Sequence, residues 1–176
     1  MRDKNILMVD LVGQYDKIKD EINQNIINSL QVGKFINGPI VKEFSQNLSN
    51  FLNVKHVIPC ANGTDALSIA LSSLELGDDA EVIVPGNTYV ATCLGVVHNN
   101  YKLVLCDCDS NTYQISLDDL RRKITKKTRA IIVVHLYGMM SNMDDVCDIC
   151  RDNNIVLLED AAQAHGAEWK GKKAGS

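Results

Sequence analysis

The sequence predicts an α/β fold in which helices cover both faces of a mostly parallel sheet. From Lys55 onward, short apolar runs alternate with segments of helical periodicity, the pattern of repeated strand–helix units. Several runs are apolar at consecutive positions, as expected for strands that are buried on both faces. The length of 176 residues and the apolar content of 45% are enough for one substantial core. A layered α/β domain is therefore expected.

Two amphipathic helices are expected before the first strand. In residues 14–31, apolar side chains recur every three or four positions, and Gly33 marks the end of the helix. A second helix, with its own apolar stripe, opens at Pro39. Residues 1–54 are therefore expected to form an N-terminal helical arm, and residues 55–176 the α/β domain.

Five strands separated by helices are expected in the α/β domain. Ser116 and Ser141 are each followed three positions later by an aspartate, which resembles the capping box at the start of a helix. A further helix, over residues 64–76, is expected to stop at Gly77. The predicted strands are residues 57–60, 81–84, 103–106, 130–134 and 155–158, and the remaining predicted helices are residues 117–124 and 143–151.

Composition and charge exclude several classes of partner and site. The formal net charge of −4 argues against a surface for nucleic acid or acidic lipid. The apolar run near the N-terminus is too short for a signal peptide, and no later run approaches the length of a membrane span, so a cytoplasmic protein is expected. The six cysteines are expected to be mostly buried small hydrophobes, and no nearby histidine completes a zinc site with them. No metal is expected.

Polar and aromatic residues concentrate just after the predicted strands. Ligands of open α/β sheets gather beyond the carboxyl ends of the strands, so these positions are the first candidates for a site. They are Asn62, Gly63, Thr64 and Asp65; Asn87, Thr88 and Tyr89; Asp107 and Asp109; His135, Tyr137 and Gly138; and Glu159, Asp160, Gln163 and His165.

Each of the main candidates has a functional and a structural interpretation. The turn before the helix at Thr64 offers free backbone N–H groups and a hydroxyl for a phosphate, but Thr64 is equally suited to cap the helix. Asp160 ends an apolar strand, where it either meets a cationic ligand or caps the following loop. Tyr89 either stacks on a flat ring or packs half-buried. His135 and His165 are expected to be satisfied polar residues rather than metal ligands.

One sheet edge would then carry a phosphate site, an aromatic side chain that can stack on a flat ring, and a carboxylate. This combination suits a planar, phosphorylated and protonated heterocycle. Pyridoxal 5'-phosphate fits that description, because its ring nitrogen needs an acidic partner to stay protonated. The sequence closely resembles the DegT/DnrJ family of sugar aminotransferases. The resemblance is carried by NGTDAL (62–67), VPGNTYVAT (84–92), DSNTY (109–113), VHLYG (134–138) and EDAAQAHGA (159–167), with FINGP (35–39).

The resemblance implies a fold type I enzyme whose large domain is a three-layer α/β structure, present here without its C-terminal end. It implies that Gly63 and Thr64 bind the cofactor phosphate, Tyr89 stacks on the ring, Asp160 pairs with the ring nitrogen, and Gln163 contacts the ring hydroxyl. It also implies that the amino group passes, usually from glutamate, to a keto-sugar attached to a nucleotide, for polysaccharide or amino-sugar biosynthesis. A homodimer with the cofactor near the subunit boundary is expected.

The same resemblance places the Schiff-base lysine a short way beyond Ser176. Lys170, Lys172 and Lys173 match basic linker residues of the family, so none of them is assigned the catalytic role. The chain is therefore expected to be the N-terminal part of an aminotransferase and to be inactive alone. Two alternatives stay open: a sugar dehydratase of the same family, in which a histidine replaces the lysine, or a truncated remnant without catalytic function.

Overall fold

The computed structural model describes residues 8–176. Contacts divide the chain into two compact units, one ending at Leu48 and the other spanning Ser49–Ser176. Half of the N-terminal apolar run (residues 6–9), which is too short for a signal peptide, lies outside the described residues. Among residues 8–176, no helix is both long enough and apolar enough to cross a membrane.

Helix α1 (Leu11–Val32) forms as the apolar period predicts. Asp10 caps it, because the Asp10 carboxylate accepts a hydrogen bond from the Gly13 N–H at 2.8 Å. The helix ends at Gly33, which adopts the left-handed conformation (φ 64°) and donates its N–H to the Ser29 carbonyl. All side chains of α1 are at least partly exposed. Helix α2 (Pro39–Leu52) begins at the predicted proline.

Four predicted strands form the central sheet of the described residues. They are β1 (Glu81–Pro85), β2 (Lys102–Cys106), β3 (Thr128–Val134) and β4 (Val156–Asp160), all parallel, in the order β2-β1-β3-β4. The inner strands β1 and β3 are almost entirely buried. Consecutive apolar residues on these strands therefore reflect a sheet that is covered on both sides, as predicted.

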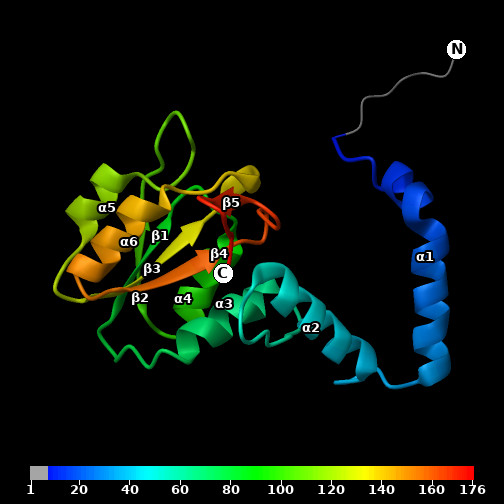
Figure 1. The fold of residues 1–176 in the computed structure, drawn as a ribbon. Helices are drawn as coiled ribbons and strands as arrows, with labels where there is room; N and C mark the ends of the chain where they lie inside the picture. Colours follow the sequence, from blue (N-terminus) through cyan, green and yellow to red (C-terminus); the bar gives the residue numbers. More distant parts are fainter. Residues whose placement is uncertain (1–7) are drawn as a thin grey trace, which may run out of the picture. The chain divides into compact units, whose positions relative to one another are not determined.

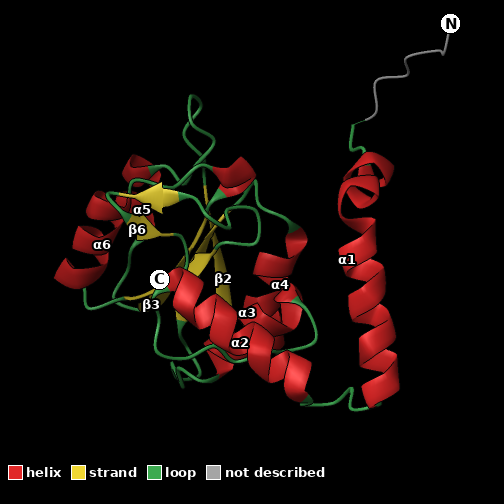
Figure 2. Cartoon of the chain, turned by 45° about the vertical axis from the view of Figure 1, so that its right-hand side comes forward, coloured by secondary structure: helices red, strands yellow, loops and turns green. Residues whose placement is uncertain are grey.

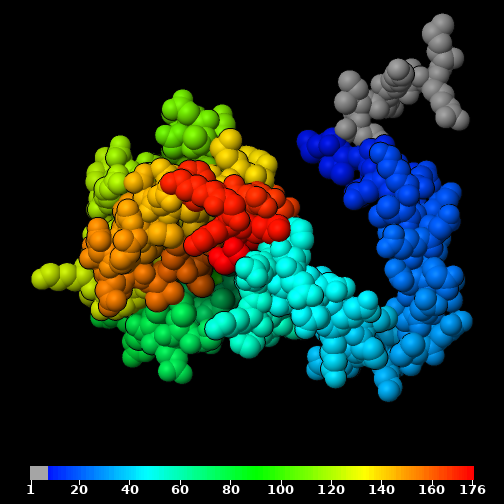
Figure 3. Space-filling model, in the orientation of Figure 1, coloured from blue at the N-terminus to red at the C-terminus, as the bar shows by residue number. Residues whose placement is uncertain are grey.

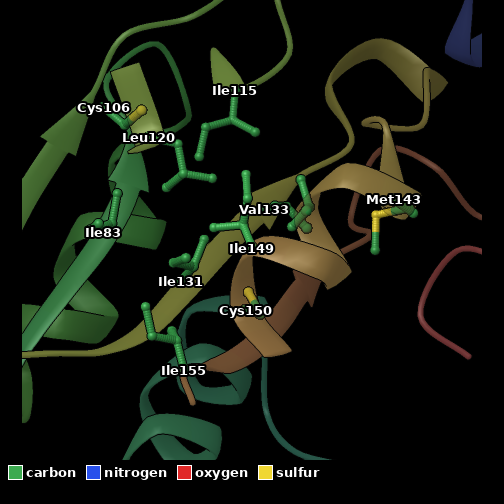
Figure 4. Packing of buried hydrophobic residues seen from close by; sticks show 11 residues of the cluster. Ile83, Cys106, Ile115, Leu120, Ile131, Val133, Met143, Ile149, Cys150 and Ile155 are labelled. Atoms are coloured by element: carbon green, nitrogen blue, oxygen red, sulfur yellow. The ribbon is translucent and has the colours of Figure 1, made fainter. Parts of the chain in front are cut away.

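Successive residues of the strands feed two separate hydrophobic clusters. Ile83, Ile131 and Val133 pack with residues of α5 (Leu117–Lys123) and α6 (Met143–Asp152) on one face (Figure 4). Val82, Val84 and Ile132 pack on the other face with residues of α3 (Gly63–Ser72) and α4 (Val90–His98). Figures 1 and 2 show the sheet between these helix pairs. The structure is the expected three-layer α/β arrangement.

Two predicted elements differ from the structure. Residues 57–60 do not form a strand; Ile58 is 83% exposed, and no neighbouring strand among the described residues pairs with this segment. Without hydrogen bonds to a neighbouring strand, an apolar run alone does not form a strand. Helix α3 ends at Ser72 rather than just before Gly77, because Glu75 turns into the left-handed region (φ 47°). Leu74 and Leu76 still pack on the core, so the apolar pattern continues beyond the end of the helix.

Helix α4 lies between β1 and β2, where a helix was expected without a stated range. The 3-10 turn η1 (Leu136–Gly138) after β3 and the hairpin of β5 (Glu168–Trp169) and β6 (Lys172–Lys173) after β4 were not among the predicted elements. In Figure 3 these last residues, coloured red, lie on the surface beside the orange residues of α6. An ion pair between Lys170 and Asp144 of α6, at 2.5 Å, holds the hairpin there.

The cysteines are free thiols that are buried, partly buried (Cys93 and Cys108) or exposed. Cys106 and Cys150 are buried in the core beside the sheet, and burial raises the pKa of Cys106 to about 12 and that of Cys150 to about 11. These two behave as the small hydrophobes that were expected. Cys60 and Cys147 are exposed, contrary to that expectation. Among residues 8–176, no group of three or more potential metal ligands is present.

The cluster between the sheet and helices α5 and α6 should dominate stability. Leu120 is fully buried in it, so Leu120→Ala should lower the free energy of unfolding by about 2–5 kcal/mol. Leu94→Ala, at a helical position that is 36% exposed, is the matched control and should cost markedly less. Urea unfolding measures both variants, and equal losses would contradict this assignment of the core.

Candidate functional site

The carboxyl ends of the four parallel strands meet at one edge of the sheet. β3 and β4 run in register from Ala130 opposite Val156 to Val134 opposite Asp160, and Figure 1 shows their arrowheads at the same end. The segments that follow β1, β3 and β4 therefore start from this edge and bring Tyr89, Tyr137 and Asp160 there. This is the edge at which sequence predicts a ligand site.

The first turn of α3 can receive an anion. Asn62 caps the helix: its side-chain oxygen accepts the Asp65 N–H at 2.9 Å. The N–H groups of the next residues, Gly63 and Thr64, belong to the first turn, where N–H groups have no partner within the helix. A Cβ added at Gly63 would meet nothing within 4 Å, so a ligand has room to approach the backbone. The helix dipole adds to the attraction.

The structure corrects the suggestion that Thr64 is the N-cap. The extended backbone of Asn62 (φ −163°, ψ 173°) lets its short amide side chain reach the N–H three residues later. Thr64 is instead the second residue of α3, inside the first turn. Its hydroxyl is therefore not needed as a cap, and it stands beside the same backbone N–H groups.

Asp160, the last residue of β4, is held through both carboxylate oxygens. Oδ2 accepts a hydrogen bond from the Thr92 hydroxyl at 3.2 Å, and Oδ1 accepts one from the Ala162 N–H at 3.1 Å. The Asp160 carbonyl accepts the His135 N–H at 3.1 Å. The loop contact expected from the structural interpretation is thus present. Because two carboxylate oxygens offer about four acceptor positions, capacity remains for a cationic partner.

Tyr89 presents its ring to the outside. It is the residue before α4, its side chain makes no capping bond, and it is 73% exposed. The half-buried packing considered from sequence is therefore wrong, and the ring is free to cover a flat ligand. Helix α4 also packs closely on α3, since a Cβ at Gly95 would lie 3.0 Å from the Leu67 Cβ. The elements that carry Tyr89 and Gly63 are thus in direct contact.

Gln163 lies three residues beyond Asp160 in the loop after β4. Its side-chain oxygen accepts the Tyr137 N–H at 2.8 Å. Tyr137 has a left-handed backbone (φ 58°), an uncommon conformation for a side chain of this size. The bond fixes which end of the amide faces Tyr137, so the NH₂ group of Gln163 is directed elsewhere and can donate to a ligand.

The buried His135 pairs with the partly buried Glu159 behind the edge. His135 is fully buried; its Nδ1 accepts the Ser141 N–H at 3.2 Å, which places the ring proton on Nε2, 3.0 Å from Glu159 Oε2. The Gly175 N–H donates to the same oxygen at 3.0 Å. His135 is therefore a satisfied polar residue, as expected. Although burial raises the pKa of Glu159, the donors His135 and Gly175 outweigh it and hold the pKa below its ordinary value.

The three lysines near the end of the chain make contacts on the surface of the α/β unit. Lys170 pairs with Asp144 at 2.5 Å, and the Lys173 ammonium lies 4.6 Å from the centre of the Phe51 ring. Lys172 lies on β6, in the hairpin. These contacts engage Lys170 and Lys173 in holding the hairpin.

Comparison with known proteins identifies the family. Residues 16–176 match the model of the DegT/DnrJ/EryC1/StrS aminotransferase family. A relative from Pseudomonas aeruginosa, UDP-2-acetamido-2-deoxy-3-oxo-D-glucuronate aminotransferase, is 43% identical over 169 residues, which are 96% of this chain and 47% of the relative. The chain spans a little under half the length of such curated relatives.

Solved structures agree with the fold and with the cofactor expected from sequence. S. venezuelae DesV, solved with a ketimine intermediate, is 31% identical with a TM-score of 0.93 over 97% of this chain and 46% of its own. E. coli GDP-4-keto-6-deoxy-D-mannose-3-dehydratase, solved with bound hydrated pyridoxal phosphate, is 26% identical with a TM-score of 0.83 over 88% of this chain and 41% of its own. The expected family and its cofactor, pyridoxal phosphate, are confirmed.

The Glu159 contacts predict a specific pH dependence of stability. Because the folded pKa lies below the unfolded one, the ionised carboxylate stabilises the fold above about pH 4.5, and this contribution disappears as the pH falls through the folded value. Glu159→Gln should therefore be less stable than the wild type at pH 7 and lose less stability on acidification. Urea unfolding between pH 7 and about pH 3 tests this. Glu168→Gln, at an exposed position on β5, is the control. If the unfolding free energy of Glu159→Gln falls with acidification as steeply as that of the wild type, the contacts of Glu159 do not contribute as described.

Proposed function

Because the chain belongs to the DegT/DnrJ/EryC1/StrS aminotransferase family, we propose that it forms the cofactor-holding part of an enzyme that aminates a nucleotide-linked keto-sugar. Glutamate is the proposed amino donor, and amino-sugar or polysaccharide biosynthesis the proposed role. The observation that carries the proposal is the position of Asp160 at the end of β4, held by donors on both oxygens and beside the segment of Tyr89. The Pseudomonas relative, an aminotransferase for a UDP-linked keto-sugar, supports the substrate class.

The candidate residues Gly63, Thr64, Tyr89, Asp160 and Gln163 fit pyridoxal phosphate in the chemistry of their donors and acceptors. The Gly63 and Thr64 N–H groups, with the Thr64 hydroxyl, would hold the phosphate at the positive end of α3. The Asp160 carboxylate would accept a hydrogen bond from the ring nitrogen and keep a proton there. The exposed Tyr89 ring would cover one face of the cofactor and exclude water, and the Gln163 NH₂ group would donate to the ring hydroxyl.

The cofactor, when bound, supplies an electron sink for the chemistry at the substrate carbon. The protonated ring nitrogen is what makes it effective, so Asp160 acts by holding a proton at that atom. Asp109 has a different role. Its carboxylate accepts N–H bonds from Asn111 and Thr112 within its own turn, and these bonds, that from Thr112 first, lower its pKa.

We do not assign proton transfer at the substrate to Lys170, Lys172 or Lys173. The contact of Lys170 with Asp144 and that of Lys173 with Phe51 support a structural role for the hairpin. The 176-residue chain by itself is accordingly proposed to bind the cofactor without holding it covalently and to lack amino transfer. A homodimer is also proposed, and the exposed isoleucines of α1 offer apolar surface for it. A cytoplasmic location is proposed as well.

The alternative function is dehydration of a nucleotide-linked keto-sugar. The similarity to the E. coli dehydratase at 26% identity keeps it open, whereas the Pseudomonas aminotransferase at 43% favours amination. In the whole protein, ¹⁵N-labelled glutamate with a UDP-linked keto-sugar separates the two: amination places ¹⁵N in the sugar, and dehydration removes one water. A remnant without catalytic function would do neither.

The phosphate assignment predicts a selective effect of Thr64→Val. The substitution removes one hydroxyl from the first turn of α3, so affinity for pyridoxamine 5'-phosphate should fall by about tenfold or more, the effect of one lost hydrogen bond to a charged group. Affinity for pyridoxamine, which has no phosphate, should not change. Calorimetric titration measures both ligands. Thr112→Val, in the Asp109 turn, is the control; an equal effect of Thr64→Val on both ligands would refute the phosphate contact.

If Asp160 contacts the ring nitrogen, Asp160→Asn should lower the affinity for pyridoxamine 5'-phosphate by about tenfold or more, since a neutral amide no longer stabilises a protonated ring nitrogen. Asp109→Asn changes the charge equally but in a self-contained turn, and should leave the affinity within twofold of the wild type. The same titration compares the two variants. Equal losses would remove the basis for placing the ring nitrogen at Asp160.

A further inference from the structure

A chain of two hydroxyl groups leads to the Asp160 carboxylate. The Thr88 and Thr92 hydroxyl oxygens lie 3.0 Å apart, and the Thr92 hydroxyl lies 3.2 Å from Asp160 Oδ2. Thr92 is only 1% exposed, whereas Thr88 is half-buried. Thr88 is one of the residues expected at the edge from sequence, and neither threonine was expected to contact the cofactor.

The direction of these hydrogen bonds follows from the chemistry of the acceptor. An ionised carboxylate has no proton to give, so Thr92 must donate to Asp160. A hydroxyl has a single proton, and Thr92 has then used it. The contact between the two threonines must therefore run from the Thr88 hydroxyl to the Thr92 oxygen. The chain is directional, from Thr88 through Thr92 to Asp160.

The position of Thr92 joins two parts of the site. Thr88 and Thr92 flank Tyr89, and Thr92 lies in the first turn of α4. The segment that presents the exposed Tyr89 ring thus also holds Asp160, which comes from β4, 68 residues further along the chain. Because the Ala162 N–H holds the other carboxylate oxygen, the two donors together restrict rotation of the carboxylate group.

We propose that Thr92 is a positioning residue that orients the Asp160 carboxylate toward the ring nitrogen of a cofactor lying against Tyr89. Thr88 supports it by fixing the direction of the Thr92 hydroxyl. The inference rests on the proposed function, because it assigns an orientation to the carboxylate that the function requires. It predicts that the Thr92 hydroxyl affects recognition of the ring nitrogen and not of the phosphate.

The test uses two ligands and a matched set of variants. The ligands are pyridoxamine 5'-phosphate and its 1-deaza analogue, in which a C–H group replaces the ring nitrogen. Thr92→Val keeps the shape of the side chain and removes the hydroxyl, and Thr92→Ser restores it. Thr128→Val is the control, because Thr128, the first residue of β3, is 3% exposed and its hydroxyl oxygen accepts the N–H of Thr125 instead. Urea unfolding of each variant reports its stability independently of any ligand.

Thr92→Val should weaken binding of pyridoxamine 5'-phosphate by about fivefold, less than the loss expected for Asp160→Asn because the carboxylate charge remains, and should leave binding of the deaza analogue unchanged. Thr92→Ser should bind like the wild type, Thr88→Val should have a smaller effect in the same direction, and Thr128→Val should have none. In Asp160→Asn, adding Thr92→Val should cost nothing more, since the two residues act through one contact.

The results that overturn the inference differ from those that overturn the proposed function. If Asp160→Asn weakens pyridoxamine 5'-phosphate but Thr92→Val does not, or if Thr92→Val weakens both ligands equally, Thr92 is not a positioning residue and the proposed function stands. If the wild type binds pyridoxamine 5'-phosphate no better than Asp160→Asn does, the proposed function fails, and the inference fails with it.

Discussion

The parallel pairing of β3 with β4 is the constraint on which the rest of the site depends. It places Val134 opposite Asp160 at the last step of the ladder, and the His135 N–H continues the pairing to the Asp160 carbonyl. The carboxylate is therefore attached to backbone that is fixed on one side by a buried strand. A shift of one residue would move Asp160 to the opposite face of the sheet, because side chains alternate along a strand.

Two layers of hydrogen bonds support this arrangement. At the edge of the sheet, the Thr92 hydroxyl and the Ala162 N–H donate to the carboxylate oxygens of Asp160. Behind it, Glu159 joins His135 to the backbone of Gly175, so the chain after β6 is tied to the end of β4. Adjacent residues of one strand thus serve different purposes, with Asp160 directed to the site and Glu159 to the protein interior. Groups supported in this way suit a site that must hold a proton at a defined atom.

Sequence patterns predicted the sheet because burial on both faces leaves a strong signal. The consecutive apolar residues of β1 and β3 identified them as strands covered on both faces, and Gly33 correctly marked the end of α1. Residues 57–60 carry the same apolar signal without the pairing partner that a strand needs, and such a partner is not visible in local sequence. The end of α3 was misjudged because Leu74 contacts the core from a turn.

The positions of Asp160 and Tyr89 were also predictable, but their contacts were not. Residues that follow parallel strands reach one edge whatever their side chains, so Asp160 and Tyr89 could be placed there from sequence. Thr92 lies inside a helix and reaches Asp160 only through the tertiary packing of α4 against the sheet. Likewise the choice of Asn62 over Thr64 as the cap of α3 depends on the backbone angles of Asn62. A chemically plausible residue type was therefore a weaker guide than its place in the fold.

The central claim, that Asp160 holds a proton on the ring nitrogen of the cofactor, is tested most directly by ¹⁵N NMR. Pyridoxamine 5'-phosphate labelled at the ring nitrogen would be bound to the chain at a pH at which the free ligand has lost its ring proton. The wild type should give the shift of a protonated ring nitrogen, and Asp160→Asn that of the neutral ring. A neutral ring in the wild type, or a protonated ring in both proteins, would contradict the claim.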